Sequence, residues 1–155
     1  MKPADLLDQA LHLARRARGK PKRADLCRAQ SAAYYALFHR LCLLCAGSLL
    51  GLTPAARQQP KWVKLYRSLR HENARKCCQS LGAIRSISVD LAGPAQVFVE
   101  LQDKRHRADY DPSYRPLKSV VLNDIEQAGS AIAQLETLSD LKQREFALFL
   151  LYKQE

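Results

Sequence analysis

The sequence predicts an all-α fold, and three observations carry that prediction. Only six glycines and seven prolines interrupt the 155 residues, and the stretches between them are rich in Ala, Leu, Arg, Lys and Gln, which favour helix. Apolar residues recur at intervals of three and four. Only the doubtful stretch Ile84–Leu91 hints at the alternation of a strand. We therefore expect a single domain, an antiparallel up-and-down bundle of four or five helices with an extra C-terminal helix.

Glycine and proline residues, together with the spacing of apolar residues, indicate where the expected helices begin and end. Gly19 and Pro21 separate the first two helices, and Pro112 prevents simple continuation of the fourth. A weakly patterned break follows the third helix. The expected helices cover 3–18, 23–50, 61–81 and 94–110, followed by a segment that begins near 117 and an extension over 139–155.

The C-terminal third carries the most regular pattern. Apolar residues repeat at four, three, four and three, a seam typical of helix bundles, at Val121, Ile125, Ala128, Ile132 and Leu135. Ser139 and Asp140 are candidate caps for a further helix, and Gln143 is placed to complete a capping box from Asp140. The tail "FALFLLYKQE" is apolar nearly all round, so we expect it to pack against a second copy of the chain.

The formal net charge of +10 comes from 25 Lys and Arg against 15 Asp and Glu. A small domain with this excess is attracted to polyanions such as RNA, DNA, an acidic partner or an anionic membrane. The alternative is a basic surface that serves solubility alone. Arg15–Arg23, with six cations around a glycine and a proline, is either a phosphate-contacting loop or a solvated connector.

The chain begins without a signal-peptide core, and its most apolar run, Leu41–Leu52, is short for a membrane span. We therefore expect a cytoplasmic protein, not bound to a membrane, with reduced cysteines. Cys42 and Cys45 form a C-x-x-C pair, but they lie in a leucine-rich helix, where cysteine behaves as an apolar residue. Core packing is favoured over a zinc site, and neither a metal nor a cofactor is expected.

The expected third helix places basic residues opposite Trp62. Lys64, Arg67, His71 and Arg75 fall on that side at about 100° per residue. Two arginines beside the histidine disfavour its charged form, so it should be neutral near neutral pH. A neutral histidine can accept a proton and arginines can hold a phosphate, which suits RNA cleavage. A solvated face is the simpler interpretation.

The expected fourth helix places Arg105 on an apolar stripe with Asp109 four residues on. A guanidinium that faces a core needs such a partner. His106 and Tyr110 form a second pair at the same interval. The group is either a structural plug or half of a polar cleft.

The second helix carries polar residues beside its apolar stripe. Ser31, Tyr35 and His39 are spaced by four residues. We expect His39 to be a hydrogen-bonded packing residue, which is the commoner role of a lone histidine in such a place.

Three stretches together resemble the HEPN-domain superfamily. "SAAYYALFHRL" is similar to its Tyr-Tyr-Ala-x-Phe-His segment, and "RHRADYDP" to the Arg-x-x-Ala-Asp-Tyr motif that ends the fourth helix in one bacterial branch. "YRSLRHENARK" resembles a middle helix in uncharacterised members of that branch. The resemblance implies a four- or five-helix bundle that forms a homodimer. It also implies association with RNA or nucleotides, often beside a nucleotidyltransferase in toxin–antitoxin or defence systems.

Active HEPN ribonucleases need no metal and use an Arg followed by His with four to six residues between them, joined across the dimer. No histidine here follows an arginine at that spacing. Three hypotheses remain open. The first and slightly favoured one is a non-catalytic binding module, dimeric and partnered by a nucleotidyltransferase or sensing a nucleotide. The second is a metal-independent endoribonuclease, and the third is a structural homo-oligomer without a nucleic-acid role.

For those functions the sequence offers two groups of candidates. The candidate catalytic residues are Arg67, His71, Arg105, Asp109 and Tyr110. The candidate binding residues are Tyr35, His39, Lys64, Arg75 and His106.

Overall fold

The computed structural model describes residues 2–152, and all regular elements in that range are helices, so the predicted all-α class is confirmed. The α-helices are α1 Pro3–Arg15, α2 Arg23–Leu50, α3 Pro54–Arg57, α4 Pro60–Tyr66, α5 His71–Gln79, α6 Leu81–Ile87, α7 Ala92–Tyr110, α8 Lys118–Glu136 and α9 Asp140–Leu151. A 3₁₀ turn, η1, covers Val89–Leu91.

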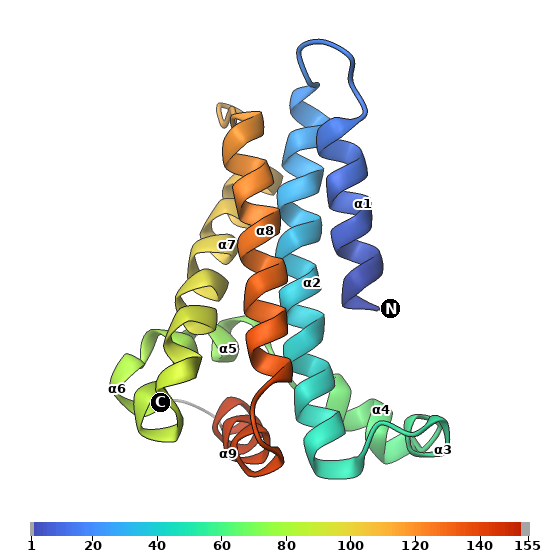
Figure 1. Cartoon of the computed structure of the whole chain (residues 1–155), viewed down its shortest axis with the longest axis vertical. Coiled ribbons are helices and arrows are strands. Elements are labelled where there is room, and N and C mark those ends of the chain that lie inside the picture. Colours follow the sequence, from blue (N-terminus) through green and yellow to red (C-terminus); the bar gives the residue numbers. More distant parts are fainter. Residues whose placement is uncertain (1, 153–155) are drawn as a thin grey trace.

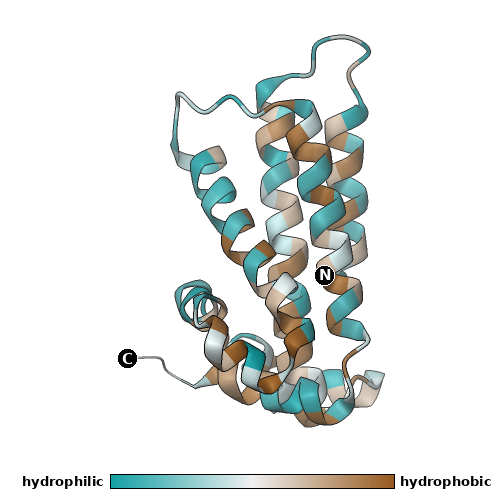
Figure 2. Cartoon of the chain, turned by 60° about the vertical axis from the view of Figure 1, so that its left-hand side comes forward, coloured by the Kyte–Doolittle hydropathy of each residue, from teal (hydrophilic) through white to brown (hydrophobic). Residues whose placement is uncertain are grey.

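The long helix α2 lies at the centre of the molecule. It contacts α1, α4, α7, α8 and α9, and α1, α2, α7 and α8 run alternately up and down beside one another (Figure 1). Tyr34, Leu37 and Leu44 of α2 are at most 1 % exposed, because neighbours cover the helix on several sides. Each long helix carries both apolar and polar residues (Figure 2), as expected for helices around a shared core.

By length and composition alone, α2 is apolar enough to cross a membrane, while 56 % of its most apolar window is buried inside the chain. Such a helix is also what the core of a compact helical protein requires. All five cysteines are buried. The interpretation of Cys42 and Cys45 as core residues is therefore confirmed.

Two predicted boundaries are wrong. The first helix ends at Arg15 rather than near Arg18. The expected third helix is two helices, α4 and α5, because Arg70 has an extended backbone with φ −104° and ψ 142°. Ser68 donates its hydroxyl to the Lys64 carbonyl, which satisfies a carbonyl at the end of α4. The break lets the buried Leu69 reach the core.

The stretch that hinted at a strand is helical. It contains most of α6 and all of η1. Ile84 and Leu91 are almost completely buried, so burial on one side of short helical turns explains the spacing that resembled alternation.

The C-terminal pattern is confirmed, since all five residues of the predicted seam are buried. Ser139 caps α9 by accepting from the Lys142 amide at 3.2 Å. Gln143 donates to the Leu138 carbonyl at 3.0 Å instead of completing a box from Asp140.

The chain itself covers part of the apolar tail, while Leu148 stays 48 % exposed and the contact with a second copy stays a prediction. Phe146, Ala147 and Leu150 are at most 2 % exposed within the chain itself, where α9 packs on α2 and α5. Residues 153–155 of the predicted extension lie outside the described residues.

Candidate nucleic-acid interface

Arg105 joins α7 to α2. Its Nη2 donates to Tyr35 Oη at 2.8 Å, and its Nε lies 2.9 Å from Asp109 Oδ2. Asp109 in turn accepts from Ser31 Oγ at 2.6 Å. The arginine side chain is 18 % exposed and the aspartate side chain 32 %. The Arg105–Asp109 pair expected from the sequence is therefore present, as a partly buried tether between two helices.

Aromatic rings surround this tether. The Arg105 guanidinium carbon lies 5.7, 5.3 and 5.9 Å from the ring centroids of Tyr34, Tyr35 and Tyr110, within cation–π range. Tyr110 is 65 % exposed and lies 4.9 Å from the His106 ring, centroid to centroid. Tyr110 therefore presents a ring to solvent next to a fixed positive charge.

His71 lies on the other side of the same tyrosines. Its Nδ1 is 2.6 Å from Tyr34 Oη, and its ring stacks on Phe38 with 3.8 Å between centroids. It also meets the Tyr35 ring edge-on, with 5.9 Å between centroids. Arg105 from α7 and His71 from α5 thus border one tyrosine pair on α2.

The hydrogen bonds around Tyr34 determine the tautomer of His71. Arg75 donates to Gln102 Oε1, which leaves Gln102 Nε2 to donate to Tyr34 Oη and to the His71 carbonyl. Burial raises the pKa of Tyr34, so its hydroxyl keeps its proton, and we infer that it donates this proton to His71 Nδ1. His71 is then neutral with its proton on Nε2, where it acts as a donor.

The neutral state of His71 agrees with the sequence prediction, but its cause differs. Burial lowers the pKa of His71 first, and the nearby Arg105 lowers it further, followed by His39. Arg67 and Arg75 were the expected causes, yet Arg75 forms an ion pair with Asp103 at 2.8 Å. The helix break at 67–70 also separates Arg67 from the helix of His71, so the predicted stripe along a single helix is wrong.

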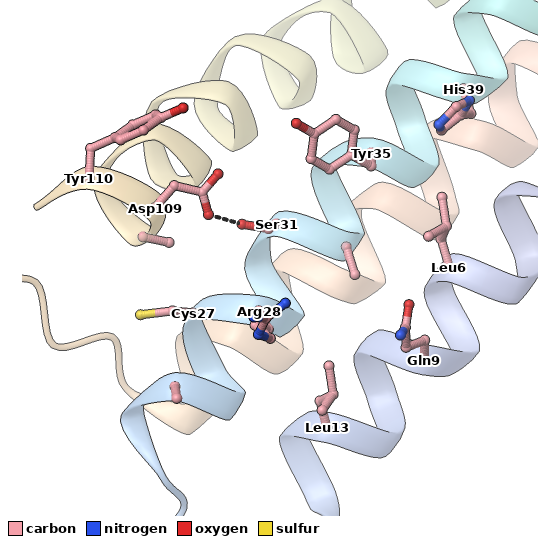
Figure 3. Close-up of a pocket in the computed structure, with 13 residues that line it drawn as sticks. Leu6, Gln9, Leu13, Cys27, Arg28, Ser31, Tyr35, His39, Asp109 and Tyr110 are labelled. Atoms are coloured by element: carbon pink, nitrogen blue, oxygen red, sulfur yellow. Dashed lines mark hydrogen bonds between the residues drawn. The ribbon is translucent and has the colours of Figure 1, made fainter.

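A groove of about 750 Å³ runs along α2 between α1 and α7, here named the α1–α7 groove. Figure 3 shows Leu6, Gln9 and Leu13 of α1 opposite Asp109 and Tyr110 of α7. Its floor on α2 contains Cys27, Arg28, Ser31, Tyr35 and His39.

His39 lies at one end of the α1–α7 groove. Its Nδ1 contacts the Tyr66 hydroxyl, and burial lowers its pKa. The predicted role of His39 as a hydrogen-bonded packing residue is confirmed, although the residue also lines the groove.

A second groove, of about 960 Å³, lies at the junction of α4 and α5 and is named the α4–α5 groove. Lys64, Arg67, Arg70 and His71 line it. Within residues 2–152, no carboxylate pairs with the three cations, and the lining Glu72 forms its ion pair with Lys76 at 3.6 Å. This groove therefore presents uncompensated positive charge beside a neutral histidine.

The structure distributes the predicted residues over these two grooves. Arg105, Asp109, Tyr110, Tyr35 and His39 gather along the α1–α7 groove or directly behind it, and Lys64, Arg67 and His71 line the α4–α5 groove. Arg75 and His106 line neither.

Sequence reasoning missed two of the cations that line the grooves. Arg70 forms the extended step between two helices that were expected to be one. Arg28 lines the α1–α7 groove from the exposed side of α2. A cation directly before the histidine was the available signal for Arg70.

Among the described residues, no group of three or more His, Cys, Asp and Glu side chains is placed to hold a metal ion. Comparisons with family models, with curated proteins and with solved structures find no match to the chain. The candidate interface therefore rests on its own geometry and charge.

Proposed function

We propose that this chain is a HEPN-like helical binding module that associates with RNA or nucleotides through their phosphates. The proposal includes a cytoplasmic homodimer and a nucleotidyltransferase partner in a system of the toxin–antitoxin or defence type. The alternating directions of α1, α2, α7 and α8 (Figure 1) support the HEPN-like part, as do the three motifs described above.

One observation carries the binding proposal. The α4–α5 groove gathers Lys64, Arg67 and Arg70 with no carboxylate paired to them in the described chain. Each cation is exposed, so a phosphate can displace the counterions around them, and release of those counterions favours binding. Arginine forks suit phosphate oxygens, and the Nε2 proton of His71 adds a neutral donor.

A short oligonucleotide tests the proposal at this groove. Anisotropy of a labelled oligouridylate of about 4 nucleotides is measured between about 50 and 200 mM salt, where phosphate contacts weaken steeply. The double variant Lys64→Ser/Arg67→Ser should weaken binding and reduce the salt slope by about 1.4, because each phosphate that a cation neutralises on a single strand adds about 0.7 to that slope.

The matched control is Arg85→Ser/Arg144→Ser, which removes the same charge from exposed positions outside the α4–α5 groove. If both double variants weaken binding equally, the loss comes from the lower net charge and not from the α4–α5 groove. Negligible, salt-insensitive binding would favour the third hypothesis, a structural oligomer.

A metal-independent ribonuclease is the second candidate, because Arg105 and His71 border the same tyrosine pair. In a ribonuclease of this kind, Arg105 and His71 would do the work of the Arg and His that active HEPN ribonucleases carry four to six residues apart, a spacing that this chain lacks. With the Tyr34 hydroxyl donating to Nδ1, as inferred above, the imidazole proton lies on Nε2. His71 is then a donor there rather than a base, which favours binding over cleavage. Incubation of mixed RNA with the protein and EDTA, with His71→Ala as control, decides between them.

A further inference from the structure

The end of the molecule opposite the α4–α5 groove is also cationic. The connections α1–α2 and α7–α8 meet there (Figure 1). Arg23 holds them together by donating to the carbonyls of Tyr114 at 2.7 Å and Asp111 at 3.0 Å. The cationic pole is defined as six exposed cations of these connections and of the last turns of α1 and α7, none of which forms an ion pair with a carboxylate in residues 2–152: Arg15, Arg18, Lys20, Lys22, Arg107 and Arg115.

The carboxylates near the pole are already engaged. Asp25 pairs with Arg16 at 2.9 Å. Asp111 accepts hydrogen bonds from the amide and the hydroxyl of Ser113, which lower its pKa. Asp111 therefore stays ionised and offsets part of the charge of Arg107 and Arg23, which also lower its pKa, but the cations at this end outnumber the two carboxylates. The bonds of Arg23 fix the two connections that carry the remaining positive charge.

The α1–α7 groove leads away from this pole. Its floor on α2 extends from Ala24, next to Arg23, to His39. At about 1.5 Å per residue those positions are roughly 22 Å apart. Arg28 lines the groove near the pole, and Tyr35 lines it near the far end (Figure 3).

The far end of the α1–α7 groove adjoins the α4–α5 groove. His39 of the first groove contacts Tyr66 of α4. Tyr35 of the first groove and His71 of the second have ring centroids 5.9 Å apart. The pole, the α1–α7 groove and the α4–α5 groove thus follow one another along α2, with cations concentrated at the two ends, and this succession is here named the track.

We propose that this track binds one strand of single-stranded RNA, with phosphates on the two cationic ends and bases in the α1–α7 groove between them. The exposed Tyr110 and the half-buried Tyr35 offer ring faces, and stacking of unpaired bases on such rings strengthens single-strand binding. Gln9 and Ser31 offer polar atoms to base edges. Arg105 compensates Asp109, the carboxylate that would otherwise repel the strand.

A single strand fits this geometry better than either alternative ligand. A mononucleotide has too few phosphates to contact both cationic ends, which lie further apart than the roughly 22 Å of groove floor. The bases of a duplex are paired and stacked, so a duplex offers its shape and backbone to a protein rather than free base faces. Its bases therefore cannot stack on Tyr35 between α1 and α7. The inference rests on the proposed function and narrows its ligand to an unpaired strand of about 4–16 nucleotides.

Length dependence tests the track. Anisotropy is compared for labelled single-stranded oligouridylates of about 4 and about 12 nucleotides, which bracket common site sizes, and for a duplex of the longer length. The longer strand should bind roughly tenfold tighter than the shorter one, and tighter than the duplex, because only it reaches both cationic ends. Equal affinity for the two lengths, or for the duplex, would overturn the track.

Two variants examine its parts. Lys20→Ser/Lys22→Ser should weaken the longer strand several-fold and leave the shorter one unchanged, with a salt slope lower by about 1.4. Gln9→Glu places a carboxylate in the groove and should weaken the longer strand. Its control is Gln127→Glu, an exposed position that lines neither groove.

The outcomes separate this inference from the proposed function. If Lys64→Ser/Arg67→Ser weakens every strand while Lys20→Ser/Lys22→Ser changes nothing, the binding function stands and the track is wrong. If no strand binds, both the proposed binding function and the track are wrong. Binding to phosphatidylserine vesicles that depends on Lys20 and Lys22, without any dependence on RNA length, would assign the pole to a lipid surface instead.

Discussion

Tyr34 Oη lies 2.6 Å from Nδ1 of His71 and accepts a hydrogen bond from Gln102 at the same time. The tyrosine therefore donates its own proton to the imidazole, which stabilises neutral His71. Tyr34→Phe removes that donor, and the pKa of His71 should rise while burial keeps it below 6.5. Titration by NMR measures it, with Tyr66→Phe as control at His39. An unchanged or lower pKa of His71 would contradict the hydrogen-bond assignment.

Protein stability should depend on pH through His39 and His71. Burial lowers the pKa of both in the folded chain, so the unfolded chain takes up protons first as the pH falls. The free energy of unfolding is then highest above the ordinary pKa of 6.5, decreases as the pH falls from 6.5 towards the lower folded pKa values, and levels off below them. Urea unfolding at about pH 7.5 and about pH 5.5 measures the difference. The variant His39→Gln/His71→Gln should show a smaller difference in the free energy of unfolding between these two pH values. An equal difference in the variant would show that other titrating groups cause it.

Arg105→Ala should lower the free energy of unfolding by about 1–3 kcal/mol, the cost of leaving polar partners unsatisfied. The loss is smaller than the ~3–5 kcal/mol of a fully buried pair, because Asp109 is 32 % exposed and reaches water. Urea unfolding provides the measurement. Arg107→Ala, on the same helix and exposed, is the control, and equal losses would show that the tether contributes no specific stability.

Gly51→Ala should destabilise the chain by about 1–3 kcal/mol, since its backbone lies in a region that is almost exclusive to glycine. Gly51 has φ 86° and ψ 170° where α2 ends, and its carbonyl accepts from Trp62 Nε1 at 2.9 Å. Gly19→Ala is the matched control, because a Cβ there meets nothing within 4 Å. Thermal unfolding should show a lower midpoint for the first variant and an unchanged or slightly higher one for the second.

Asp124→Ala should cost about 1–3 kcal/mol, as loss of the acceptor of a buried donor does. Asp124 is 3 % exposed and accepts from Gln30 at 2.8 Å and from Lys104. Its removal leaves the buried Gln30 amide without that acceptor, while Lys104, whose side chain is 30 % exposed, can reach water. Chemical unfolding compares it with Glu126→Ala on the exposed side of the same helix. A loss below about 1 kcal/mol, the range of surface pairs, would mean that water replaces the carboxylate.

Interactions within one helix could be predicted from the sequence. The Arg105–Asp109 pair follows from a spacing of four residues, and the seam of α8 follows from its repeat. The break between α4 and α5 could not be predicted in this way, because the buried Trp62 and Leu69 are seven residues apart and would also share one face of a continuous helix. The pattern of residues 61–81 suits one continuous helix equally well.

Contacts between residues far apart in the sequence could not be predicted for a related reason. Tyr35 and Arg105 are 70 positions apart, and Tyr34 and His71 are 37 apart. No local periodicity encodes which polar residues of α2 meet those of α5 and α7. The sequence contained the members of the site, while the packing of three helices determines which of them meet.

The central position of α2 has a consequence for synthesis of the protein. The last helix that packs on it, α9, begins about 90 residues after α2 ends, which at about 5–20 residues per second is a delay of seconds. During that delay the nascent chain exposes an apolar helix that is long enough to attract a membrane or another unfinished chain. Chaperone capture on the ribosome should therefore concentrate on α2 and end when α9 emerges.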